Sequence, residues 1–227
     1  QFLAARSTKH PIRKPTMSLS FDSARLNNPC LTAEHEQWRT HVRRFIEKEI
    51  MPYAGEWDEL GKIPDDLWPK TGAAGVLGLG YPEQYGGTSE GIDIWYHNIF
   101  SEEIARVGVG GVPSTLLVHG IGLPPVANFA TDAVKEQVVP AVISGEKRIS
   151  LGITEPSGGS DVANIQTTAR RQGDYYIVNG SKTFISGGMG ADWVTTAVRT
   201  GGEGRAHVAR LGRGGHDPGH SKAVVLP

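Results

Sequence analysis

The stretch LGITEPSGGSDVANIQTTARRQGDYYIVNGSKTFIS, residues 151–186, decides how this chain is interpreted. It opens with a hydroxyl, an acid and a proline at 154–156, continues into Gly158 and Gly159, and ends at Phe184, Ile185 and Ser186. Adjacent glycines let a backbone approach a bulky ligand closely and leave N–H groups free to face it. From the residues alone, a ligand-binding edge and a surface turn are equally good interpretations.

The pattern around this stretch predicts β-strands. Residues 149–153 alternate between apolar and small side chains, and three further segments are rich in β-favouring residues: 167–171, 175–178 and 193–198. Asn-Gly at 179–180 is the strongest short hairpin signal in the chain. We therefore expect residues 182–185 to pair back across this turn, so that the stretch closes with an antiparallel hairpin.

The part before the stretch predicts helices. The first runs from about Thr32 to Ile50, with Thr32 as N-cap, apolar residues at helical spacing and Pro52 after its end. Further helices are expected to begin at residue 65 and to span 91–108, 112–120, 124–129 and 132–139, the last with Pro140 near its end. The short loops predict a bundle. The fold class is therefore α+β: an N-terminal all-helical bundle followed by an incomplete antiparallel β domain.

The chain divides into four parts by composition. Residues 1–16 are a basic extension outside the fold, either a targeting remnant or sequence upstream of a start at Met17. Residues 17–148 form the all-α domain, and 149–204 the first part of a β-barrel-like domain. Residues 205–227 are rich in Arg, Gly and His and show little strand pattern. This tail predicts a reading-frame change near Gly204, with a divergent native loop as the alternative.

Composition narrows the classes of function. A net charge of -1 over 227 residues gives no electrostatic case for nucleic acid or an anionic membrane. The single cysteine, Cys30, excludes an internal disulfide and fits a reducing compartment. Apolar runs fall short of the roughly 20 residues of a membrane helix. The histidines lack metal-site spacing, so no metal is expected.

Two motifs at this spacing resemble the acyl-CoA dehydrogenase family. They are LGITEPSGGSD and YYIVNGSKTFISGG, and the helical part adds LGLGYPEQYGG, SEEIAR and PAVISGE. The resemblance covers about Thr32 to Gly204. It implies FAD as cofactor, lined by Leu151, Gly152, Ile153 and Thr154 onward to Ser160. It further implies that the Thr154 hydroxyl bonds the pyrimidine edge of the flavin and that Ser160 contacts the pantetheine–phosphate portion of the CoA thioester.

By the same resemblance, the second motif forms the other edge of the flavin site. Phe184, Ile185 and Ser186 match a tripeptide usually written Trp-Ile-Thr, in which the aromatic ring covers the flavin and the hydroxyl bonds N5. The substitutions here keep an aromatic face and a hydroxyl. Asn164 departs from the signature, which prefers a small residue. Residues 114–121 are expected to help line the acyl pocket.

The implied reaction is α,β-dehydrogenation of a fatty acyl-CoA to the 2-enoyl-CoA. A carboxylate removes the α-proton, the β-hydrogen leaves as hydride to the flavin, and electrons pass to an electron-transfer flavoprotein. No glutamate in the chain matches the catalytic base, which is expected beyond residue 227, so little or no turnover is expected from this chain alone. The alternatives are an acyl-CoA oxidase or flavin monooxygenase of the same superfamily, or an inactive truncated helical module.

The resemblance also carries expectations about assembly and location. Full-length members of the family are homo-oligomers. A bacterial cytoplasmic location is expected, with the mitochondrial matrix as the alternative. Neither membrane insertion nor nucleic-acid binding is expected.

Overall fold

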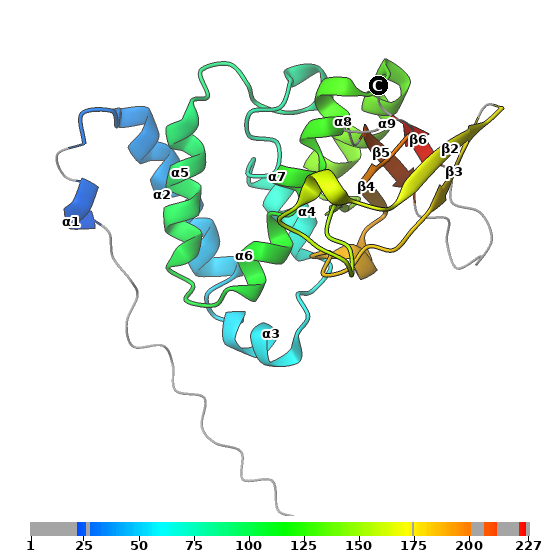
Figure 1. Cartoon of the computed structure of the whole chain (residues 1–227). Helices are drawn as coiled ribbons and strands as arrows, with labels where there is room; N and C mark the ends of the chain where they lie inside the picture. The colour runs from blue at the N-terminus through cyan, green and yellow to red at the C-terminus, as the bar shows by residue number, and fades with distance from the viewer. Residues whose placement is uncertain (1–21, 26–27, 174, 201–206, 213–222, 226–227) are drawn as a thin grey trace, which may run out of the picture.

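Helices come first along the chain and strands follow, which confirms the predicted α+β class (Figure 1). The computed structural model describes residues 22–25, 28–173, 175–200, 207–212 and 223–225. The predicted basic extension at 1–16 lies outside the described residues, as does much of the predicted tail.

The predicted first helix is α2, Ala33–Glu49, and its start is a capping box. The Thr32 hydroxyl accepts a hydrogen bond from the His35 N–H, and the His35 ring accepts one from the Thr32 N–H at 3.0 Å. Reciprocal caps of this kind satisfy N–H groups that a helix start otherwise leaves unpaired. The predicted N-cap is therefore confirmed. The fully buried Val42 and Ile46 join the core between α2 and α5, Ile94–Ala105.

A buried ionic cluster joins α2 and α5. Glu103 is 1 % exposed. Its carboxylate accepts hydrogen bonds from Arg43 Nε at 2.8 Å, Arg106 at 2.9 Å and Arg39 at 3.2 Å. A buried charge is tolerated when donors surround it in this way. The cluster therefore fixes how the two helices lie against each other.

Eight further helices precede the strands in the described part of the chain. They are α1 Asp22–Arg25, α3 Ala54–Leu60, α4 Leu67–Ala73, η1 Glu83–Tyr85, α6 Gly111–Leu116, α7 His119–Gly122, α8 Pro124–Phe129 and α9 Asp132–Ile143. The expected helix at 112–120 is divided between α6 and α7, and Pro140 lies inside α9. A hydrophobic cluster runs from Leu123 through α9 to Ile149, so the first strand packs directly on the helices.

The main sheet has the order β1-β4-β5-β6. Its strands are β1 Ile149–Gly152, β4 Trp193–Val198, β5 His207–Gly212 and β6 Ala223–Val225. β1 and β4 are parallel, whereas the other pairs are antiparallel. β5 and β6 fall within residues 205–227, where the sequence pattern predicted little strand structure. The Thr195 hydroxyl of β4 donates to the Gly122 carbonyl at 2.7 Å, which ties the sheet to α7.

The predicted hairpin at 179–180 is wrong. β2, Thr168–Gln172, pairs antiparallel with β3, Tyr175–Asn179, so the chain turns around Gly173 instead. Residues 182–185 form no strand. Gly180 has φ 150°, and a Cβ there would lie 2.4 Å from Thr167 Oγ1. Only glycine fits at position 180, because the backbone there passes so close to Thr167. The chain after Gly180 therefore does not turn back to pair with β3.

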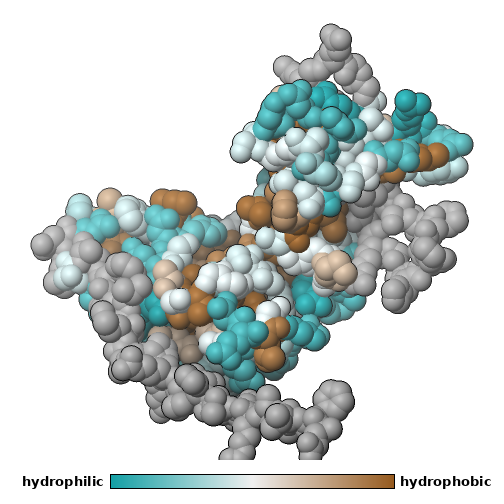
Figure 2. All heavy atoms as spheres, turned by 60° about the horizontal axis from the view of Figure 1, so that its bottom comes forward, coloured by the Kyte–Doolittle hydropathy of each residue, from teal (hydrophilic) through white to brown (hydrophobic). Residues whose placement is uncertain are grey.

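The helical and strand parts meet at a notch with hydrophobic side chains at its base (Figure 2). Among the described residues, no helix combines the length and apolar character required to span a membrane.

Candidate functional site

The structure brings the two halves of the 151–186 stretch side by side. Leu151 and Gly152 lie on β1, and the chain leaves this strand at Ile153 and Thr154. The Thr183 N–H donates to the Thr154 carbonyl at 2.9 Å. The Lys182 ammonium donates to the Ile153 carbonyl, also at 2.9 Å. The segments that carry the predicted site residues are therefore directly bonded, although residues 182–185 form no strand.

A buried carboxylate lies beneath this junction. The oxygens of Glu155 accept from the N–H groups of Gln166 at 2.6 Å and Thr167 at 2.9 Å, the Thr167 hydroxyl at 2.6 Å and the Lys182 ammonium at 2.8 Å. We call these four residues the Glu155 clasp. Burial opposes the charge on Glu155, but the bonds from Lys182, Thr167 and Gln166 outweigh it and lower the pKa to about 2.

Phe184 is held out from the surface in a strained conformation. Its side chain is 90 % exposed, and its φ of 55° is the one left-handed value among the described non-glycine residues. Such a backbone costs on the order of 1 kcal/mol or more and concentrates at functional sites. The residue therefore offers a free aromatic face next to the Thr183–Thr154 bond.

Three residues with side-chain hydroxyls lie on the segments that these bonds join. Ser186 is exposed, and its carbonyl accepts from the Ser150 hydroxyl of β1 at 2.9 Å. Thr154 is half-buried, and a Cβ on Gly159 would lie 3.2 Å from its methyl group, so the glycine loop packs tightly on this side chain. Ser160 is exposed in the bend that precedes the short 3-10 helix η2, Val162–Asn164. An exposed aromatic ring and hydroxyl side chains on two bonded segments suit a flat ligand with a polar edge, which is the shape of a flavin.

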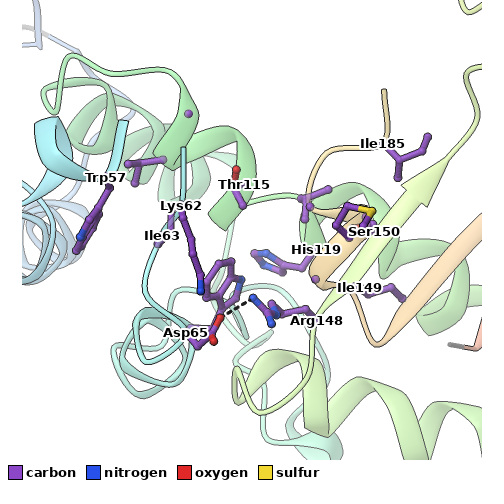
Figure 3. A pocket seen from close by; sticks show the side chains of 18 of the residues that line it. Trp57, Lys62, Ile63, Asp65, Thr115, His119, Arg148, Ile149, Ser150 and Ile185 are labelled. Carbon is purple, nitrogen blue, oxygen red and sulfur yellow. Dashed lines mark hydrogen bonds and ion pairs between the residues drawn. The ribbon is translucent and has the colours of Figure 1, made fainter. Parts of the chain in front are cut away.

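A cavity of about 590 Å³ lies between the helices and the strands (Figure 3). Ile185 lines it, whereas Thr154, Ser160, Phe184 and Ser186 do not. From the segment expected to face an acyl group, Thr115, Val118 and His119 line the wall, and the His119 ring points into the space. The apolar part of the wall comprises Trp57, Ile63, Trp68, Leu77, Val112, Val118, Val142, Ile149, Ile185 and Met189.

One side of the cavity is charged, which the sequence did not indicate. Arg148 pairs with Asp65 at 3.0 Å, and its guanidinium lies 4.7 Å from the ring centre of Trp68. Figure 3 shows this pair and the nearby Lys62 side chain. An arginine that stacks on an indole and pairs with a carboxylate is held in one geometry.

His119 adds a polar but uncharged surface to the same wall. Burial lowers the pKa of its ring to about 4, so the imidazole is neutral at physiological pH. Its Nδ1 atom is buried without a hydrogen-bond partner among the described residues. The helical wall of the cavity therefore places no positive charge at this position.

Sequence reasoning missed the residues that hold the site together. Glu155 was noted only as part of the loop, and neither Lys182 nor Thr167 was singled out. The available signal was a lysine in an otherwise β-like run between Ser181 and Thr183, because a lysine that such a run buries needs an anionic partner. Its partner was not predictable without the fold.

Comparison with known proteins gives matches over most of the chain. The model for the acyl-CoA dehydrogenase N-terminal domain matches residues 32–146, and the model for the acyl-CoA dehydrogenase middle domain matches residues 150–212. The mitochondrial long-chain specific acyl-CoA dehydrogenase of Rattus norvegicus is 34% identical over 216 residues, which are 90% of this chain and 50% of that protein. The chain spans about half the length of the curated relatives it matches.

Solved structures agree with these matches. A probable acyl-CoA dehydrogenase from Mycobacterium abscessus superposes with a TM-score of 0.76 at 41% identity, covering 86% of this chain and 55% of that one. An acyl-CoA dehydrogenase complexed with FAD from Bacillus anthracis has a TM-score of 0.69 at 26% identity, covering 87% and 37%. Because both family models together match well over half of the sequence, the chain belongs to the acyl-CoA dehydrogenase family.

Proposed function

We propose that this chain holds the flavin edge of FAD and the acyl group of a fatty acyl-CoA for α,β-dehydrogenation. The observation that carries the proposal is the bonded junction of Thr154 with Thr183, next to the exposed ring of Phe184. In the proposal, the polar groups of this junction and the ring of Phe184 together form the surface that the flavin contacts. The family is FAD-dependent, and the relative from Bacillus anthracis is described as an FAD complex.

Each predicted site residue has a role in this proposal. Leu151, Gly152 and Ile153 offer backbone groups along the edge, Thr154 and Ser186 offer hydroxyls, and Phe184 covers the ring. Ser160 lies at the exposed end, where the CoA portion would extend. FAD supplies the two-electron acceptor when bound, while the residues of this chain bind it, orient it and exclude water from one face.

The acyl chain is proposed to enter the 590 Å³ cavity. Val118 and Ile185 give it an apolar wall, and Ile185 neighbours both Phe184 and Ser186. Neutral His119 adds no charge that an apolar chain would have to desolvate.

The catalytic base is proposed to lie outside the described residues. Glu155 is the carboxylate bonded into the flavin-edge junction, and it is a poor base because its pKa is about 2 and four donors occupy its oxygens. A general base works best with a pKa near the operating pH. We therefore propose little or no turnover from the described residues by themselves.

Partners and location follow from the family. We propose an electron-transfer flavoprotein as the acceptor of electrons and a homo-oligomer as the assembly of the full-length protein. The bacterial cytoplasm, or else the mitochondrial matrix, stays the predicted compartment.

Filling the cavity tests the acyl proposal. Val118→Trp should weaken binding of octanoyl-CoA by about tenfold or more, because a lost apolar pocket removes at least ~1.4 kcal/mol, and should leave FAD affinity unchanged. Calorimetric titration with octanoyl-CoA, and with CoA as a control that lacks the acyl group, gives the comparison. An equal loss of affinity for octanoyl-CoA and CoA, or no loss of affinity for either, would contradict the assignment of the cavity to the acyl chain. Bleaching of the flavin on anaerobic addition of octanoyl-CoA would refute the absence of a base.

A further inference from the structure

The Glu155 clasp joins three segments that are distant in sequence. It links the loop after β1 at Glu155, the chain before β2 at Gln166 and Thr167, and the segment after Gly180 at Lys182. The side chains of Glu155 and Lys182 are 3% and 12% exposed. Charge-assisted hydrogen bonds in such a site are stronger than neutral ones. The clasp is therefore a rigid joint between these segments.

The joint is close to both proposed flavin edges, one residue from Thr154 and two residues from Phe184. Glu155 follows Thr154 directly, and Lys182 precedes Thr183, whose N–H bonds the Thr154 carbonyl. Lys182 also bonds the Ile153 carbonyl on the other side of Thr154. Loss of the lysine would thus remove two of the bonds that hold the 182–186 segment against the 153–155 segment.

We propose that the Glu155 clasp is a positioning device that fixes the Thr154 edge relative to the Phe184–Ser186 edge. The part of this proposal that concerns FAD rests on the proposed function, whereas the positioning itself does not. Glu155 and Lys182 are positioning residues because they act through their neighbours and do not themselves offer a group to the ligand.

A purely global stabilising role would give a different pattern of effects. The clasp residues lie outside α2 and α5, whose buried apolar residues form much of the helical core. Removal of a clasp residue is therefore expected to loosen the junction locally and to leave the α2–α5 core closed. Amide hydrogen exchange separates the two cases because it reports local opening residue by residue.

The first arm of the test needs no ligand. Lys182→Met should accelerate exchange of the Thr183 amide about 10- to 100-fold, the range for the loss of charge-assisted hydrogen bonds, while the Ile46 amide in α2 stays unchanged. Lys182→Arg should restore most of the protection because it keeps the charge. Lys70→Met, which removes an ion-paired lysine of the helical part, is the matched control and should not affect Thr183.

The second arm titrates the same proteins with FAD and follows the quenching of flavin fluorescence. Lys182→Met should weaken the binding of FAD by a factor similar to the change in the exchange rate. The double variant Glu155→Gln/Lys182→Met should lose less binding free energy than the sum of the losses in the two single variants. If Lys182→Met fails to fold, Thr167→Val removes one donor to Glu155 and keeps both charges, and the same local loosening is expected from it.

The outcomes distinguish the two proposals. Unchanged exchange at Thr183, or equal acceleration at Ile46, would overturn the positioning role. Local acceleration with FAD affinity unaltered would overturn its link to the ligand. Faster local exchange at Thr183, in a protein whose wild-type form shows no saturable FAD binding, would support the positioning role of the clasp and contradict the proposed function.

Discussion

Glu155 shows how a single charge is kept inside this fold. Its carboxylate is removed from water, which on its own would favour the protonated form. Four donors, including the Lys182 ammonium, reverse this preference. The charged form therefore contributes stability to the folded state, and that contribution depends on pH.

The sign of this pH dependence follows from the lowered pKa. The value of about 2 in the folded state lies below the ordinary 4.5, so the stabilisation is complete above about pH 4.5 and is lost as the pH falls toward 2. We expect wild type to exceed Glu155→Gln by about 3 kcal/mol in free energy of unfolding at neutral pH, with the difference shrinking below about pH 4.5. Urea titrations at a series of pH values measure it. A difference that stays constant down to about pH 3 would contradict the assignment.

Glu103 and its neighbour Glu102 make a matched pair for the helical part. Glu103 is buried with three arginines, whereas the Glu102 side chain is 41% exposed and bonds Arg39 at its edge. Glu103→Gln should cost about 3–5 kcal/mol, because it leaves buried guanidinium groups short of charge. Glu102→Gln should cost about 1 kcal/mol or less. Chemical unfolding of both variants measures the two losses of free energy of unfolding. Similar losses in the two variants would contradict the central role of Glu103.

Residue-scale features were predictable where their partners are near in sequence. The Thr32 cap is such a case, because its partner His35 lies three residues on. The environment of Glu155 is not, because its donors lie at 166, 167 and 182 and meet only after the strands have formed. Spacing along the chain does not contain that information.

At the scale of elements, Gly180 marks where local pattern and fold disagree. Asn-Gly at 179–180 has the chemistry of a tight hairpin turn. The hairpin of β2 and β3 instead turns around Gly173, at φ 62°. The long-range approach of Gly180 to Thr167 decides the outcome and leaves Lys182 free to reach Glu155.

This difference between two glycines is testable. Gly180→Ala should cost several kcal/mol, because its φ is unfavourable and its new methyl group would overlap Thr167. Gly173→Ala should cost about 1 kcal/mol, because its φ is left-handed but nothing lies within 4 Å of the added carbon. Thermal unfolding of the two variants gives the comparison. A Gly180→Ala protein as stable as Gly173→Ala would contradict the close packing at this joint.

At the scale of the whole molecule, the order of helices and strands was predictable and the cavity was not. Hydrophobic periodicity is local, so it located most helices and the strands at β1 to β4. The cavity between helices and strands is lined from α3, α4, α6, α7, α9, β1 and the chain at 185–190, so its charged side became visible only in the fold. The position of Arg148 against Trp68 and Asp65 depends on that assembly.

The central claim is that the edges at Thr154 and at Phe184–Ser186 together bind the flavin of FAD. Equilibrium titration of the chain with FAD, followed by flavin fluorescence, tests it most directly. We predict saturable binding that Thr154→Val and Ser186→Ala each weaken by about tenfold, the effect of one lost hydrogen bond, while Ser101→Ala, at an exposed position on α5, leaves it unchanged. Absence of saturable binding, or equal affinity in all four proteins, would contradict the claim.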